Sequence, residues 1–338
     1  MSFYFYEILI FCIILFIYIH INYQLTSNSD LEIYEINEPS KNDLESIFEN
    51  KQPVLIKNLS KINDTLVPIL SLENMQKNYG FFDINISNPQ HSDEENNQKY
   101  LHITLDDSIK LFKNDKTKKF ISQNNNDFLN ETTINRVYKN SDQLIKPSLL
   151  SKSEYDYIIG DKDSTTKLQR NLSFRNFFIV TSGSATVKLV PPEYTKYLRE
   201  YKDYENFEFT SPLDVWNIQE KYQKEFQKTR SLEIKVNVGD VLFIPSYWWY
   251  SIKMNSLTSI SVYKYWTYMN HLANLPHYLL FLLQNQNISN KRYNDISDKT
   301  NTHNVTETLH KNEKKKKKKK TSVTDIHNNS IATNFTES

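Results

Sequence analysis

The stretch GDVLFIPSYWWYSIK, from Gly239 to Lys253, decides the fold that this sequence predicts. A turn leads into four apolar residues and a proline, and three consecutive aromatic residues follow: Trp248, Trp249 and Tyr250. Apolar and aromatic runs bounded by Gly and Pro are typical of buried β-strands. Because alternate residues of a strand face the same side, we expect this strand to aim Tyr250 into a pocket.

Other segments near this stretch also alternate with a period of two. The segment NFFIVTSGSATVKLVPP predicts a β-hairpin with strands over Phe177–Thr181 and Ala185–Val190, ended by two prolines. LEIKVNVGDVLFIP predicts a second strand pair around Gly239 and Asp240, and LTSISVYKYWTY predicts a last strand. The second half of the chain is therefore expected to be mainly β.

The first half predicts helices mixed with short strands. Ser40 is a candidate N-cap for a helix that contains Leu44, Ile47 and Phe48, and Val54–Ile56 follows as a strand. Further helices and strands are expected up to residue 115. Residues 123–165 are rich in Asn, Asp, Ser and Lys and are expected to be mostly loop, whereas 193–230 are expected to be helical or irregular.

Composition limits the classes of function only weakly. The chain has 338 residues and a formal net charge of +1, which argues neither for nor against nucleic acid, and no specific nucleic-acid motif is present. The single cysteine, Cys12, excludes a disulfide framework within the chain and leaves no cysteine set for zinc. Abundant Asn, Lys, Ile and Tyr with 4 Gly is typical of an AT-rich genome, such as that of a protist or a large DNA virus.

The N-terminal segment MSFYFYEILIFCIILFIYIHINYQ predicts a single-pass membrane anchor over residues 1–25, with residues 3–23 in contact with lipid. Its apolar run is slightly short of the roughly 20 residues that cross a bilayer, and tyrosines at both ends suit the two interfaces. A cleaved signal peptide fits less well, because there is no basic n-region and no small-residue cleavage site. A buried core helix fits less well because no polar face is visible. Neither the membrane nor the orientation follows from the sequence.

The C-terminal part predicts a short apolar helix and then a disordered tail. The helix near residues 271–284 is too short to span a membrane. Residues 287–338 are rich in Asn and Lys and include the lysine block Lys314–Lys320. This block is a candidate site for an anionic partner such as lipid or nucleic acid, or a nuclear signal, unless it is only a solvated run of charge.

Three motifs in order resemble the cupin-like branch of the JmjC family, the 2-oxoglutarate and Fe(II)-dependent hydroxylases. They are QPVLIKNL, YIIGDKDSTTKLQRNLSFRNFFIVTSGSATVKLVPP and GDVLFIPSYWWYSIK, and the resemblance covers roughly Glu32 to Tyr268. It implies a double-stranded β-helix (jelly-roll, cupin) core with N-terminal helices, an α+β chain that is mainly β, over residues 26–286. It also implies a C-terminal helix that often forms dimers, so a homodimer through residues 271–284 is expected.

The same resemblance implies a lost iron site. In the family, two His and one carboxylate hold iron, and a lysine after the turn glycine pairs with the co-substrate. Counting back six residues from Asn176 puts the first His at Arg170 and the carboxylate at Leu172, while the second His falls on Tyr250 and the lysine on Ala185. No histidine lies between Ile103 and Asn270, so no other register restores a site with two His ligands.

Arg170 and Tyr250 are therefore expected to point into the former metal pocket, with Asn176, Trp248 and Tyr263 as further lining. Such a pocket would hold an anionic or planar ligand through charge-assisted hydrogen bonds and stacking. Alternatively, Arg170 and Tyr250 fill the cavity and bond to each other. We expect no catalytic residue and no metal-binding residue.

Three functions remain open from the sequence. The first is a membrane-anchored pseudo-oxygenase that binds a ligand or partner and needs no cofactor. The second is an active oxygenase, a hydroxylase or demethylase, that uses Fe(II) and 2-oxoglutarate with Tyr250 as an unusual ligand; a phenolate ligand is costly, since the pKa of tyrosine is near 10. The third is a structural membrane anchor with a basic interaction tail.

Overall fold

The structure is a computed structural model that describes residues 2–88 and 100–288. The predicted tail from residue 289 onward, with its lysine block Lys314–Lys320, lies outside the described residues. The chain divides after Tyr278 into two compact units, and the barrel and its covering helices belong to the first.

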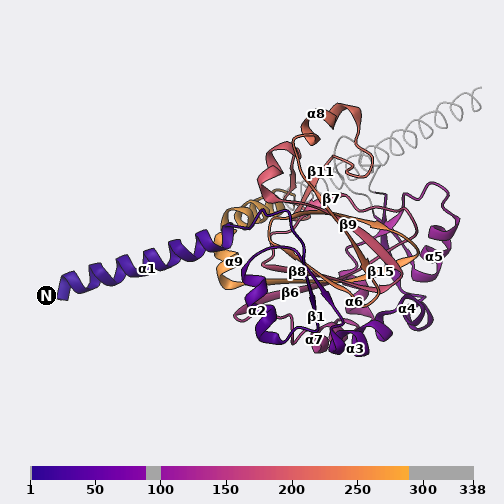
Figure 1. Cartoon of the computed structure of the whole chain (residues 1–338), viewed down its shortest axis with the longest axis horizontal. Helices are drawn as coiled ribbons and strands as arrows, with labels where there is room; N and C mark the ends of the chain where they lie inside the picture. The colour runs from indigo at the N-terminus through magenta and orange to yellow at the C-terminus, as the bar shows by residue number, and fades with distance from the viewer. Residues whose placement is uncertain (1, 89–99, 289–338) are drawn as a thin grey trace, which may run out of the picture. The chain divides into compact units, whose positions relative to one another are not determined.

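Within the described residues the chain forms two β-sheets (Figure 1). The larger sheet contains, in spatial order, β1 (Tyr34–Asn37), β2 (Val54–Lys57), β13 (Val241–Pro245), β8 (Arg175–Ser182), β15 (Thr258–Thr267), β6 (Leu150–Gly160), β5 (Ile121–Ser122), β3 (Asp83–Ser87) and β4 (Leu101–Thr104). The smaller sheet contains β10 (Tyr201–Asp203), β11 (Glu208–Ser211), β7 (Leu168–Arg170), β14 (Trp249–Met254), β9 (Ser184–Val190) and β12 (Leu232–Asn237).

The described helices are α1 (Ser2–Leu25), α2 (Lys41–Glu49), α3 (Ser60–Leu70), α4 (Leu72–Tyr79), α5 (Leu105–Asn114), α6 (Asn126–Glu131), α7 (Asn135–Ser141), α8 (Gln223–Phe226) and α9 (Tyr268–Ala273), with 3-10 turns η1 (Pro192–Tyr197) and η2 (Glu220–Tyr222). Residues 275–288 are also helical. The chain is therefore mainly β with N-terminal helices, as the sequence predicts.

Successive strands of the core pass back and forth between the two sheets. β6, β8, β13 and β15 belong to the larger sheet, and β7, β9, β12 and β14 belong to the smaller one. The inward faces of both sheets share one apolar core, which includes Phe178 and Val262 from the larger sheet and Leu189 and Ile252 from the smaller one. The two sheets therefore enclose a barrel, and its interior is filled by side chains that alternate along each strand.

The outer face of the larger sheet is covered by the N-terminal helices, along the lower side of Figure 1. Leu44 and Phe48 of α2, with residues of α3 to α7, pack on outward side chains such as Phe177, Phe243 and Tyr263. The ring of Phe48 lies 4.5 Å from the ring of Phe243 and 5.2 Å from that of Phe177. This layer makes the larger sheet buried on both faces, which explains the apolar runs of its strands.

Local signals in the sequence mark several elements correctly. Ser40 caps α2, because its side chain accepts a hydrogen bond from the backbone of Asp43 while the Asp43 carboxylate bonds back to Ser40. Thr104 caps α5, since its side chain accepts a hydrogen bond from the backbone of Asp107. The hairpin of β8 and β9 turns at Gly183, whose φ of +73° is favourable only for glycine.

The prediction that residues 123–165 are mostly loop is wrong. They contain α6, α7 and β6, which pairs along its length with β15. In β6 the side chains of Tyr155, Tyr157 and Ile159 pack under the helices, and Ile158 faces the barrel. The polar residues around this strand conceal its alternation in the sequence. Residues 193–230, expected to be helical or irregular, also contain β10 and β11.

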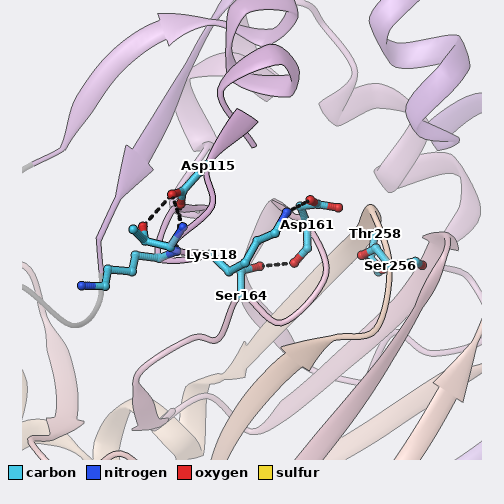
Figure 2. A network of polar contacts seen from close by, with 8 residues as sticks. Asp115, Lys118, Asp161, Ser164, Ser256 and Thr258 are labelled. Carbon is cyan, nitrogen blue, oxygen red and sulfur yellow. Dashed lines mark hydrogen bonds and ion pairs between the residues drawn. The ribbon is translucent and has the colours of Figure 1, made fainter. Parts of the chain in front are cut away.

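One end of the barrel is closed by a polar network, shown in Figure 2. The carboxylate of Asp115 accepts bonds from the backbone of Thr117 and Lys119, which orders this loop. The Lys118 ammonium then lies 2.5 Å from Asp161, and Ser164 donates a 2.7 Å bond to the Asp161 carbonyl. These contacts lie beside Met254 and the turn before β15, so we call this end of the barrel the closed end.

The segment after α1 crosses the opposite end of the barrel. The Trp248 indole donates a 3.0 Å hydrogen bond to the carbonyl of Asn28, and Ile33 packs against the barrel core. The Lys51 ammonium donates to the carbonyls of Tyr23 and Thr26, at the C-terminal end of α1, and burial lowers its pKa to about 8. The end of α1 is therefore attached directly to the fold.

The Gly183 turn gives a first test of this architecture. We expect Gly183→Ala to destabilise the chain by about 1–3 kcal/mol, since a left-handed backbone is unfavourable with a side chain. The new Cβ would also meet the Leu257 carbonyl at 2.6 Å. Thermal unfolding of the full chain in detergent, followed by circular dichroism, measures the loss.

The control is Val238→Ala, an exposed position in the turn that precedes β13, which should leave the midpoint unchanged. Equal midpoints for the wild type and Gly183→Ala would contradict the turn geometry.

Candidate functional site

The pairing of β7 with β14 determines which side chains enter the barrel. Tyr250 lies opposite Gln169, and Trp249 lies opposite Arg170. Residues directly opposite each other in antiparallel strands share a face of the sheet. Tyr250 belongs to the barrel core and Trp249 to a separate cluster outside it, so Gln169 faces inward and Arg170 faces outward.

Inside the barrel, the Tyr250 phenol is held by two amides. Gln169 Nε2 and Asn171 Nδ2 each donate to its oxygen at 3.1 Å, and its ring packs edge-on against Phe178 at 4.9 Å. Burial raises the pKa of Tyr250, although Lys264 and the two amides act in the opposite direction. The phenol is therefore neutral near pH 7.

Asn176 extends this set of hydrogen bonds. Its carbonyl oxygen accepts from Asn171 Nδ2 at 3.0 Å and from the Ser173 hydroxyl. Its amide nitrogen donates to the Ile244 carbonyl at 3.1 Å. Asn176 lines the same end of the barrel as Tyr250, as expected, and its bonds fix the loop that carries Asn171.

Arg170 does not share a pocket with Tyr250, and this expectation is wrong. The Arg170 guanidinium pairs with Glu200, with its Nε 2.5 Å from the carboxylate, and packs against Phe209, Tyr247 and Trp249. Both charged side chains are largely buried, with exposed fractions of 10% and 13%. Arg170 is thus a buried ion-pair residue on the outer face of the smaller sheet.

Two other expected lining residues also lie outside the barrel. Leu172 packs with Phe209 and Tyr247 on the outer face of the smaller sheet. Tyr263 lies under the helices, where its hydroxyl is 2.9 Å from that of Ser141. Strand alternation explains both positions. Leu172 directly follows the inward residue Asn171, and Tyr263 directly follows the inward residue Val262, so each of them faces outward.

Ala185 and Trp248 do lie in the barrel core, but at opposite ends. Ala185 is paired with Met254 near the closed end, whereas Trp248 lies just before Tyr250. Lys188 faces outward, as expected from alternation, and pairs with Glu233 at 2.8 Å. The interior near Ala185 is therefore purely apolar.

Lys264 is the cation that enters the barrel near Tyr250. On β15 it lies two residues after Val262 and four after Ile260, which both face inward, so its side chain faces the same side. Among the described residues its ammonium forms no hydrogen bond or ion pair. Burial lowers the pKa of Lys264, but the phenolate form of Tyr250 and the carboxylates of Glu154, Asp156 and Glu208 raise it more, so the net pKa is raised. Near pH 7, where Tyr250 is neutral, these carboxylates keep the ammonium charged.

Carboxylates balance this charge from a greater distance. Asp156 on β6 is occupied by three backbone amides, those of Asn124, Asn125 and Tyr157, at 2.7–3.0 Å. Glu208 on β11 accepts from Asn124 Nδ2 at 2.7 Å, and burial raises its pKa. These acids are already bonded to the protein, and among the described residues neither of them pairs directly with Lys264.

Comparison with protein families gives one match. The cupin-like domain model matches residues 39–272, which is more than half of the chain. The chain belongs to the cupin-like domain family. This confirms the resemblance to the cupin-like, JmjC-type group stated above. A comparison with curated proteins finds no match.

The residues of this cupin-like domain do not fit the iron that its family implies. Within residues 2–88 and 100–288, no three His, Cys, Asp or Glu side chains are placed to hold one metal ion. The groups around Tyr250 are two amides and a neutral phenol, and Lys264 adds a positive charge that opposes a dication. No step through iron is therefore derived.

Counting along the sequence missed Gln169, Asn171 and Lys264. Gln169 and Asn171 have the i, i+2 spacing of the family's His-x-Asp pair, but Gln169 lies seven residues before Asn176 instead of six. Fixing the register from Tyr250 across the sheet would have found them. Lys264 was missed because Tyr263, its neighbour, was taken as the inward residue.

This register predicts where an iron site can be rebuilt in the cupin-like domain. We expect the triple variant Gln169→His, Asn171→Asp, Tyr250→His to bind one Fe(II) or Co(II) per chain, since it places two imidazoles and a carboxylate on one face. Metal analysis after anaerobic loading of full-length protein in detergent measures the stoichiometry.

The matched control is Arg170→His, Leu172→Asp, Tyr250→His, which introduces the same residue types with two of them outside the barrel. Stoichiometric metal in this control, with none in the first variant, would contradict the register. Comparable metal binding by the unaltered chain would show that its present residues do hold a metal.

Proposed function

We propose that this chain is a membrane-anchored cupin-like protein that binds a small anionic ligand inside its barrel and does not perform iron chemistry. Strands that alternate between two sheets support a double-stranded β-helix, the architecture that the family implies. Ligands of such barrels enter at one end, and the network around Asp161 closes the end away from Tyr250.

The observation that carries the proposal is the ammonium of Lys264. A charged group inside a protein is unfavourable unless a partner neutralises it. Among the described residues no carboxylate pairs directly with Lys264, while the polar atoms of Tyr250, Gln169 and Asn171 are nearby. A ligand carboxylate or phosphate at Lys264 would supply the missing partner and accept further bonds from the amides.

The barrel interior near Ala185 is apolar, which limits how deeply an anionic ligand can enter the barrel. Ala185 and Met254 are both fully buried and leave no polar group at the position where the family's lysine is expected. The ligand therefore lies near Tyr250 and Lys264, at the end opposite the closed one. An active oxygenase remains the second candidate only if iron is found, because no described group near Tyr250 favours it.

Membrane anchoring is supported by α1. Tyr4–Leu25 forms a helix of 22 residues with a mean hydropathy of 2.2, and its most apolar 18-residue window has no residue buried in the fold, so it is long and apolar enough to cross a bilayer. A signal sequence meets the same criteria. The attachment of the end of α1 to Lys51 favours an uncleaved anchor, because removal of α1 would leave that half-buried lysine without its carbonyl partners.

Lys264 provides the test of ligand binding. We expect millimolar 2-oxoglutarate, used as a dicarboxylate probe, to raise the unfolding midpoint of the full-length protein in detergent without iron. Ligand at ten times its Kd adds about 1.4 kcal/mol of stability. We expect Lys264→Met to abolish the midpoint shift, since it removes the charge and keeps the length of the side chain.

Lys188→Met, a lysine on the outer face, is the matched control and should keep the shift. An equal shift in Lys264→Met would contradict the proposed site. Succinate release that depends on added Fe(II) would contradict the absence of iron chemistry and favour the oxygenase.

A further inference from the structure

The last two turns of α1 lie against the fold. Ile17, His20, Ile21 and Gln24 are the residues of its second half that are at least partly covered, and they are spaced i, i+3, i+4, i+7 along one helical face. This end of α1 packs against α9. The first half of α1 is exposed throughout its described side chains.

α1 is only just long enough to cross a bilayer, so the residues that contact α9 belong to the stretch that would span it. A helix of 22 residues is about 33 Å long, and the hydrocarbon core of a bilayer is about 30 Å thick. If α1 spans the membrane, its last two turns must lie within the hydrocarbon or at its boundary. Whatever packs on those turns then lies at the same depth.

α9 has one face toward the barrel and one face uncovered. Asn270 donates a 3.0 Å bond to the Leu172 carbonyl, and Asn274, just after the helix, accepts from the Tyr247 hydroxyl at 3.1 Å. On the other face, Tyr268 is 68% exposed and Leu272, one turn later, is 37% exposed. Leu275, which follows the turn at Asn274, is 45% exposed, and we call these three residues the apolar stripe.

We propose that this stripe of Tyr268, Leu272 and Leu275 lies in the bilayer interface, on the membrane that holds α1. Tyrosine is a residue that favours the headgroup level, and the leucines next to it enter the acyl boundary. The proposal rests on the proposed anchor. A second copy of this chain on the same stripe is the competing occupant, and a helix there would remove the leucines from water equally well.

The bilayer is the better occupant because of continuity with α1. α1 packs against α9, so exposed residues beside that contact lie at the depth of the last two turns of α1. Tyrosine and leucine side chains at that depth meet lipid without a second copy of the chain.

This placement would turn the end of the barrel that holds Tyr250 and Lys264 toward the membrane. α9 begins four residues after Lys264, and the carbonyl of Asn28, three residues after α1, bonds to Trp248. The ligand site of the proposed function would therefore open at the headgroup level.

Depth-dependent quenching tests the proposal in the full-length protein. The native cysteine is removed by Cys12→Ala, and a polarity-sensitive fluorophore is attached at Leu272→Cys after reconstitution into phosphatidylcholine vesicles. We expect blue-shifted emission and quenching by a nitroxide on the lipid chain several times that of the control. The control is Val238→Cys, an exposed position in the turn before β13 near the closed end.

Each outcome separates the anchor from the stripe. Carbonate extraction of the protein from the vesicles would overturn the anchor itself. Retention of the protein with a water-like Leu272→Cys label would overturn the stripe and leave the anchor intact. Blue-shifted emission without quenching by the lipid nitroxide would assign the stripe to a protein partner and would also overturn the proposal. The same label at Leu275→Cys repeats the measurement, so that a disturbance of α9 by the substitution at position 272 is detected.

Discussion

The alternation of side chains along paired strands is the constraint on which the rest of this molecule depends. Once Tyr250 is inside the barrel, the pairing of β14 with β7 and β9 fixes the direction of every neighbour. It sends Gln169 inward and Arg170 outward, and it sends Ala185 inward and Lys188 outward. A shift of one residue would place the Arg170 ion pair in the apolar core and the amides outside, which is far less favourable.

This constraint also explains how much of the fold and site the sequence predicts. The hairpin at Gly183, the cap at Ser40 and the strand that carries Tyr250 are local features, and the sequence shows each of them. β6 is different, because its two faces are both buried and its flanks are polar, so its identity as a strand comes from pairing with β15. Gln169 and Asn171 escape notice for the related reason that an extra residue before Asn176 shifts the count by one, and only the partner strand reveals it.

The electrostatics of the interior differ between the two faces of the smaller sheet. Outside the barrel, Arg170 and Glu200 satisfy each other and are surrounded by aromatic rings, so the pair is complete without a ligand. Inside, Lys264 keeps its charge with acids that are engaged elsewhere, since Asp156 is bound to backbone amides and Glu208 to Asn124. Ion pairs that are complete within the protein are typical of structural residues, whereas buried charges without a direct partner are typical of binding sites.

The short connection between α1 and the barrel has a mechanical consequence. From Leu25 to Asn28 the chain spans three residues, which reach about 10 Å at most, and the carbonyl of Asn28 is already fixed to Trp248. Such a short connection leaves little freedom of rotation between α1 and the domain, so the domain tilts and turns together with its helix. If the proposed anchor spans a membrane, a partner of this domain must diffuse in the plane of that membrane or approach it closely, and encounters become two-dimensional.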